Sequence, residues 1–389
     1  MSGAKYLLLA LPSSVARSND PEDAFEALTS VISSSLNKND ASIHRFPIPE
    51  FKIGTLDALV LQADELAKLD ANVEAAVVKV ADVLKSVVGE ENAEGHKTVN
   101  DRPVEDYLQG FSWNKVKYRS DKSIAQLLDS LHKEVISLDN DIKTKFTAYQ
   151  QVKSNLVSVQ RKQTGNLSTR SLATILKQSD FVPPSEYLQT QLIAVPKPLE
   201  RDWLKSYETL SPMVVPRSSR EIQRDSEFIL YSCVIFKKYS GEFASKARAA
   251  KFTPREFAWS EGAAEEDERE ARDVEAHERR LSGETLRLAR TGYSDLFQAW
   301  VHVKALRVFV ESVLRYGLPL EFVSAIIQTN PKNAKKIKAQ LDAAYSYLGG
   351  NAFGRDKKGN IKDDVGDLGA GMLGDTEYSA YCYFEFDAI

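Results

Sequence analysis

A glycine-rich run near the C-terminus approximates a phosphate-binding loop. Its residues are Gly349, Gly350, Asn351, Ala352, Phe353, Gly354, Arg355 and Asp356. Such a loop needs Lys followed by Ser or Thr after its last glycine, but here Asp356 would place a negative charge beside the phosphate. We therefore interpret the run as a turn in which the glycines supply positive φ angles. A nucleotide-dependent enzyme remains a third-ranked alternative, and it predicts saturable ATP binding.

Residue types that bind metals or act as nucleophiles lack the spacing that this chemistry requires. The five histidines are His44, His96, His132, His277 and His302. No two of them lie within a turn or two of one helix, and we expect His132 and His302 to be seam or surface residues. Asp363, Asp364 and Asp367 lack EF-hand spacing. No GxSxG elbow occurs. The sequence thus indicates no catalytic residue, no metal and no cofactor.

Basic residues gather in one stretch in the middle of the chain. They are Lys237, Lys238, Lys246, Arg248, Lys251 and Arg255. One interpretation is a solvated face that offsets the acidic stretch after residue 260, and the other is a site for an acidic protein partner. Nucleic acid is a distant third, because the formal net charge of the chain is -4.

The length of 389 residues exceeds what one hydrophobic core usually supports, so we expect two or three structural units. The two cysteines, Cys233 and Cys382, lie far apart in apolar runs, which favours buried thiols in a reducing compartment. No apolar stretch approaches the ~20 residues that span a bilayer, and no secretory leader is apparent. We expect a cytosolic protein without direct membrane insertion, whose partners are proteins.

Two long helices are predicted. Residues 121–160 contain neither proline nor glycine, and apolar residues recur in steps of four and three from Ile124 to Val159. Residues 259–316 begin with mixed charges at i,i+4 spacing and end in a wider apolar stripe, before Gly317 and Pro319. The simplest way to bury both seams is an antiparallel pair, which predicts a dumbbell.

The remaining segments predict mixed α and β structure at both ends of this pair. The inserted segment, residues 161–257, has strand patterns at 191–195 and 227–237 and a helical patch at 199–210. The terminal segments have strands at 6–11, 322–327 and 380–386 and a helix at 56–88. Residues 89–103 and 351–374 are expected to be loops.

Several longer sequence segments, taken together, resemble those of a known protein family. They are PEFKIGTLD (49–57), VEDYLQGFSW (104–113), KSYETL (205–210), KFTPREF (251–257), KALRVFVESVLRYGLP (304–319), LGGNAF (348–353) with Lys357 and Lys358, and DTEY (375–378). In this order they resemble the C subunit of the eukaryotic vacuolar-type proton-pumping ATPase, and most of all its fungal form. The resemblance spans almost the whole chain.

The resemblance implies an elongated mixed α/β fold with three parts. These are a foot (1–118 and 317–389), a helical neck (119–160 and 258–316) and an inserted head (161–257). It implies a non-catalytic connector that bridges peripheral stalks of the E and G subunits to the cytosolic N-terminal region of the a subunit. The head would bind one E/G stalk, and the foot would bind another together with the a subunit.

The same resemblance implies that the protein is released when the soluble ATPase sector detaches from the membrane sector, and that actin is a further partner of some members. Candidate partner-binding residues are Lys237, Lys238, Lys246, Arg248 and Lys251 in the head, and Lys357 and Lys358 in the foot. The alternative from another class is a coiled-coil cytoskeletal or scaffold adaptor, which would not assemble specifically with the E and G subunits.

Overall fold

The computed structural model describes residues 4–33, 40–318, 321–353 and 379–389. The chain divides into a first unit, Met1–Phe146 with Thr285–Ile389, and a second unit, Thr147–Glu284. It passes from one unit to the other twice, both times inside a helix, namely α5 (Ile124–Thr164) and α8 (Ala263–Tyr316). The division into foot, neck and head remains a prediction.

The first unit is built on an antiparallel sheet of order β10-β1-β9-β2. Its strands are β1 (Lys5–Pro12), β2 (Ala41–Arg45), β9 (Phe322–Thr329) and β10 (Cys382–Asp387). Because side chains alternate between the faces of a strand, β1 fills two cores. Leu7 and Leu9 pack with helices α1 (Pro21–Ser33) and α9 (Pro331–Tyr345) on one face. Tyr6 and Leu8 face the long helices on the other.

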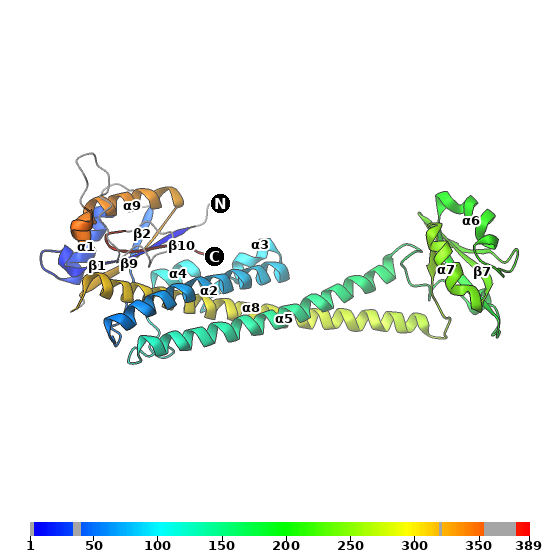
Figure 1. Ribbon diagram of the computed structural model, residues 1–389, viewed down its shortest axis with the longest axis horizontal. Coiled ribbons are helices and arrows are strands. Elements are labelled where there is room, and N and C mark those ends of the chain that lie inside the picture. The colour runs from blue at the N-terminus through cyan, green and yellow to red at the C-terminus, as the bar shows by residue number, and fades with distance from the viewer. Residues whose placement is uncertain (1–3, 34–39, 319–320, 354–378) are drawn as a thin grey trace. The chain divides into compact units, whose positions relative to one another are not determined.

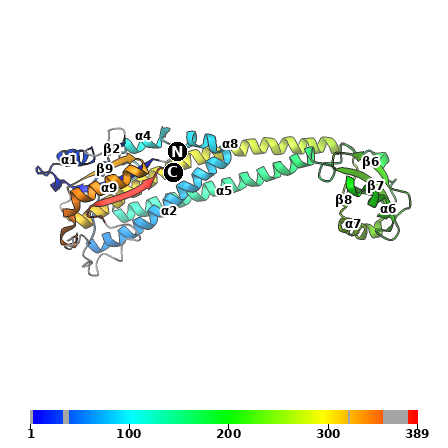
Figure 2. The same ribbon diagram turned by 90° about the horizontal axis from the view of Figure 1, so that it is seen from above.

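Three long helices cover that second face: α2 (Leu56–Val88), the first part of α5 and the last part of α8. Figures 1 and 2 show them side by side in this unit. α2 begins after Thr55, whose side chain accepts a hydrogen bond from the Ala58 N–H, and it ends before Gly89, which has φ 85°. α8 ends before Gly317, which has φ 76°, as the sequence predicts.

The prediction that residues 89–103 form a loop is wrong. It contains α3 (Glu90–Ala93) and a hairpin of β3 (Thr98–Val99) and β4 (Arg102–Pro103), followed by α4 (Val104–Gln109). Ala93 and Val99 are fully buried, so even this polar segment supplies core residues. Asn100 and Asp101 both have positive φ, as the two central residues of a tight hairpin turn require. Short 3-10 helices span Ser13–Val15, Glu94–His96 and Ser346–Phe353.

The second unit contains an antiparallel sheet of order β6-β7-β5-β8. Its strands are β5 (Leu188–Pro196), β6 (Arg220–Arg224), β7 (Phe228–Phe236) and β8 (Thr253–Arg255). Helices α6 (Glu200–Ser206) and α7 (Ser240–Ala249) contribute Trp203 and Phe243 to the core on one face. Leu167, Leu172 and Leu176 cover the other face. Short 3-10 helices span Gln178–Asp180, Lys197–Leu199, Tyr207–Thr209 and Lys237–Tyr239.

The mixed α/β class and the two long helices are confirmed, since α5 and α8 match the predicted ranges within a few residues. The strand predicted at 227–237 is central and buried, as its apolar pattern indicates. In the first unit, a Cβ on Gly292 would clash with Ile142 Cδ1, so α5 and α8 touch there. In the second unit, Lys162 Nζ lies 3.9 Å from Glu270. The dumbbell itself remains a prediction, and most of the loop predicted at 351–374 lies outside the described residues.

Candidate interaction site on the second unit

The five basic residues predicted for partner binding are all exposed on the second unit. Lys237 and Lys238 lie in the turn after β7, Lys246 and Arg248 lie on α7, and Lys251 follows it with φ 64°. Lys246 pairs with Glu242 of the same helix at 2.7 Å. Within the described ranges no ion pair joins these residues to the acidic start of α8, so that offset is not made by direct pairing.

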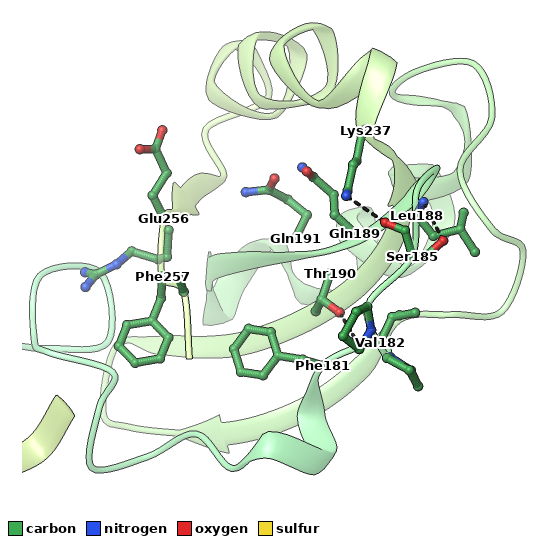
Figure 3. Close-up of a pocket in the computed structure, with 14 residues that line it drawn as sticks. Phe181, Val182, Ser185, Leu188, Gln189, Thr190, Gln191, Lys237, Glu256 and Phe257 are labelled. Carbon is green, nitrogen blue, oxygen red and sulfur yellow. Dashed lines mark hydrogen bonds between the residues drawn. The ribbon is translucent and has the colours of Figure 1, made fainter. Parts of the chain in front are cut away.

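A groove of about 670 Å³ opens beside the first of these residues. Figure 3 shows its lining side chains. They are Phe181, Val182, Pro183, Pro184, Ser185, Leu188, Gln189, Thr190, Gln191, Lys237, Arg255, Glu256, Phe257 and Ala258. We call this hollow the β5 groove, because the first residues of β5 run along it.

The β5 groove exists because β8 pairs with only a short part of β5. β7 pairs with β5 from Leu188 to Pro196, whereas β8 pairs with β5 only from Leu192 to Ala194. Beyond Arg255 the chain leaves the sheet, and Phe257 does not take the place opposite Thr190 that the register would give it. Among the residues that the structure describes, no strand therefore pairs with the edge of β5 from Leu188 to Gln191 on this side.

The two walls of the β5 groove differ in chemistry. Phe181 and Phe257 lie on one side of β5, with ring centroids 6.3 Å apart, and the Val182 N–H donates to Thr190 Oγ1 at 2.9 Å. Gln189, Gln191, Lys237 and Glu256 lie on the other side (Figure 3). One wall is thus apolar. The other offers amides, the ammonium group of Lys237 beside the start of β5, and the carboxylate of Glu256 at the end near Arg255.

The cations at the β5 groove are held in place by backbone carbonyls. Lys237 Nζ donates to the Ser185 carbonyl at 2.7 Å, so the ammonium group is fixed near the start of β5 while the side chain stays exposed. Arg255 donates to the Arg170 carbonyl at 2.6 Å, and burial lowers the pKa of its guanidinium. The fixed Lys237 can still donate to a carboxylate.

The foot candidates Lys357 and Lys358 lie outside the described residues, as do Arg355, Asp356, Asp363, Asp364 and Asp367. Gly349 lies in a 3-10 helix, Ser346–Phe353. In the described residues no group of three His, Cys, Asp or Glu side chains is arranged to hold a metal ion. Nor does any helix of the described residues combine the length and the apolar character needed to cross a membrane.

His302 has a structural place rather than a catalytic one. It is buried against Phe111, Trp113 and Tyr118 in the first unit. Its Nε2 accepts from the Asn114 N–H at 3.0 Å and its Nδ1 lies 2.7 Å from the Gln298 carbonyl, which fixes a neutral ring. Burial lowers its pKa to about 4.

A buried ion cluster in the first unit was not predicted from the sequence. Asp70 of α2 accepts from Lys304 and Arg307 of α8, and its Oδ1 lies 3.2 Å from Lys304 Nζ. The side chains of Asp70 and Lys304 are only 6% and 5% exposed. Lys304 Nζ lies 4.4 Å from the Trp300 ring centroid, and burial lowers its pKa. This cluster joins α2 to α8 inside the core, so it is structural.

Sequence reasoning also missed the β5 groove. Phe181, Thr190 and Phe257 are ordinary residues singly, and no spacing joins three positions that come from different segments. One usable signal was Pro254, because a proline in so short a strand limits how far that strand can pair.

The cysteines match the prediction: Cys233 and Cys382 are free and buried, and burial raises the pKa of Cys233 to about 12.

Comparison with known proteins gives consistent relatives. The family model that describes the C subunit of V-ATPase matches residues 6–382. The C subunit of the V-type proton ATPase of Saccharomyces cerevisiae is 41% identical over 382 residues, which covers 97% of this chain and 96% of that protein. The C 1 subunits of the V-type proton ATPases of Xenopus laevis and of Bos taurus are each 40% identical over 353 residues, covering 90% of this chain and 91% of each relative.

Among solved structures, a crystal structure of the cytoplasmic N-terminal domain of the I subunit, a homologue of the a subunit of V-ATPase, aligns with 88% of this chain and 97% of that one. The sequence identity is 15% and the TM-score is 0.37, so this alignment carries no conclusion about fold or partner. The family model and the three full-length relatives do, and together they assign the chain. It belongs to the V-ATPase C-subunit family, whose members are accessory, non-catalytic components of the proton pump.

Proposed function

We propose that this chain is a peripheral-stalk connector of the proton pump. In this proposal the second unit, which contains the predicted head, binds one stalk of the E and G subunits. The first unit, which contains the predicted foot, binds another stalk together with the cytosolic N-terminal region of the a subunit. The chain would act on the cytosolic face of vacuolar and other endomembranes and leave the pump when its sectors separate. Membership of the C-subunit family carries this proposal.

The division of the chain into two units supports a role as a connector. Two units with separate cores offer two places for partners, and two helices carry the chain from one unit to the other. An antiparallel neck between a foot and a head, the dumbbell, is part of this proposal. Several modest contacts on one chain hold a complex firmly while all are made, yet they can be released one after another.

The basic surface of the second unit favours binding of an acidic partner. Residues 237–251 contain five basic side chains and one acidic side chain, Glu242. All five basic side chains are exposed. Such a patch raises the rate at which an acidic surface docks and favours one orientation of docking. The connector proposal therefore places a stalk contact at α7.

The test measures binding of purified E/G heterodimer to the full-length chain by biolayer interferometry. One double variant, Lys246→Glu with Arg248→Glu, reverses two charges on α7. The matched control, Arg201→Glu with Lys205→Glu, makes the same change on α6 of the same unit, where both side chains are also exposed. We expect the α7 variant to bind at least about tenfold more weakly, a change of about 1.4 kcal/mol, and the control to stay within about twofold.

Each other outcome would contradict a defined part of the proposal. Equal losses in both variants would show that charge acts without a specific contact at α7. Absence of binding by the unmodified chain, with both proteins folded, would remove the E/G bridging role, although membership of the family would stand.

A further inference from the structure

The backbone at the edge of the β5 groove is free to pair. Pro254 has no N–H, so the hydrogen bonds between β8 and β5 must involve Leu192 and Ala194, the neighbours of Ile193 opposite that proline. Because backbone groups alternate in direction along a strand, the N–H and C=O of Thr190 point to the same edge. In the described residues no strand pairs with Thr190 at that edge.

The side chains around this edge specify what could fill it. A strand placed beside β5 as an antiparallel continuation of β8 would lie about 4.8 Å away and alternate its side chains between the two faces. The residue opposite Thr190 would point to the wall of Phe181 and Phe257. Its neighbour opposite Gln189 would point to the wall that contains Lys237. The place opposite Gln191 comes directly after Arg255, where the chain itself continues into Glu256, so the added strand would end opposite Thr190.

From this arrangement we propose that the β5 groove binds an extended segment of another protein by strand addition, in which an apolar residue opposite Thr190 stands next to an acidic residue opposite Gln189. The backbone of Thr190 supplies hydrogen bonds, the Phe181 and Phe257 rings receive the apolar side chain, and Lys237 receives a carboxylate. Strand addition to an open sheet edge is a general mode of peptide recognition. The excess of basic side chains over residues 237–251 favours an acidic occupant over a neutral one.

This occupant is an extended peptide that fills the groove, and so its site is distinct from the stalk contact proposed at α7. Lys237 faces the groove, whereas Lys246 and Arg248 lie on the helix. The inference does not depend on the E/G contact proposed above, and either can fail without the other.

The test uses the full-length chain and a fluorescein-labelled peptide, Glu-Val-Glu-Val-Glu-Val-Glu, followed by fluorescence anisotropy. Its charge control is Lys-Val-Lys-Val-Lys-Val-Lys. We expect saturable binding of the acidic peptide only, together with shifts of the Gln189, Thr190 and Gln191 amide signals in an NMR spectrum of the isotope-labelled chain. No saturation at millimolar peptide, or shifts confined to α7, would overturn the proposal.

Two pairs of variants separate the backbone from the charge. Thr190→Pro removes the N–H at the open edge, and its control Thr190→Val removes only the hydroxyl that accepts from Val182. Lys237→Glu reverses the charge in the groove, and Lys246→Glu makes the same change on α7. We expect at least tenfold weaker binding for Thr190→Pro and Lys237→Glu and at most threefold for their controls. If Thr190→Pro does not fold, the lysine pair decides alone, and equal losses for Lys237→Glu and Lys246→Glu would refute the groove.

Discussion

Removing Asp70 should destabilise the first unit more than removing either of its partners. Lys304 would remain buried and Arg307 half-buried without their carboxylate. Breaking a buried ion pair in this way typically costs 3–5 kcal/mol. The Trp300 and Phe386 rings lie 4.4 and 4.6 Å from Lys304 Nζ and would still stabilise the cation. We therefore expect Asp70→Ala to lower the free energy of unfolding by about 3 kcal/mol, at the lower end of that range.

The matched variant is Lys304→Met. It keeps the aliphatic length of the side chain beside Trp300, and Asp70 keeps Arg307 as its partner. Because one cation is lost but no charge is left unpaired, we expect a cost below about 1.5 kcal/mol. In the double variant the two losses should not add, and the coupling energy should be about 1–2 kcal/mol.

Native-state hydrogen exchange is the suitable assay, because a chain of two units need not unfold in one step. Amides of α8 between residues 289 and 313 report the opening of the first core, since most apolar side chains there are fully buried. Equal losses in Asp70→Ala and Lys304→Met would refute the reasoning, because both would then reflect lost packing rather than an unpaired buried charge.

Two further predictions concern the first unit. The pKa of His302 is about 4 in the folded chain, below its unfolded value of 6.5, so stability should fall as pH drops from 6.5 to 4, by up to about 3 kcal/mol. Native-state hydrogen exchange of the same α8 amides at several pH values should show that His302→Gln, which keeps a neutral donor and acceptor, removes this part of the slope; an unchanged slope would contradict the assignment. For the contact of α5 with α8, Gly292→Ala should be less destabilising in an Ile142→Val background, since Ile142 Cδ1 is the atom that a Cβ would meet. Additive effects of the two substitutions in thermal melts would rule this contact out, because contacting residues couple by 0.5–3 kcal/mol.

Periodicity predicted the long elements because each buries one regular stripe. The helix at Leu56–Val88 matches its predicted limits, and Leu59, Leu66 and Val73 of its stripe are buried. The same stripe contains the buried Asp70, although hydrophobic periodicity predicts an apolar residue at such a position. Its partners, Lys304 and Arg307, lie more than two hundred residues away, so only the tertiary structure shows that the carboxylate is paired.

The candidate site was likewise predictable only where it depends on residues close together in the sequence. The charge of residues 237–251 is local and visible in the sequence. The β5 groove depends on where β8 stops pairing and on the return of Phe181 and Phe257 to the same strand edge, and both are non-local properties. The sequence segment KFTPREF contains Pro254, Arg255 and Phe257, so a run noticed for its resemblance also forms one side of the groove.

The charged half of α8 shows how a helix persists where little core is available. Between residues 263 and 284 only Ala271 and Leu281 are buried. The ion pairs Glu268 with Arg272 and Glu275 with Arg279 have the predicted i,i+4 spacing, and each contributes about 0.2–0.5 kcal/mol. These pairs alone cannot offset the cost of starting a helix in water. The half that follows is packed throughout the core of the first unit, so it supplies the nucleus from which the charged half extends at the lower cost of propagation.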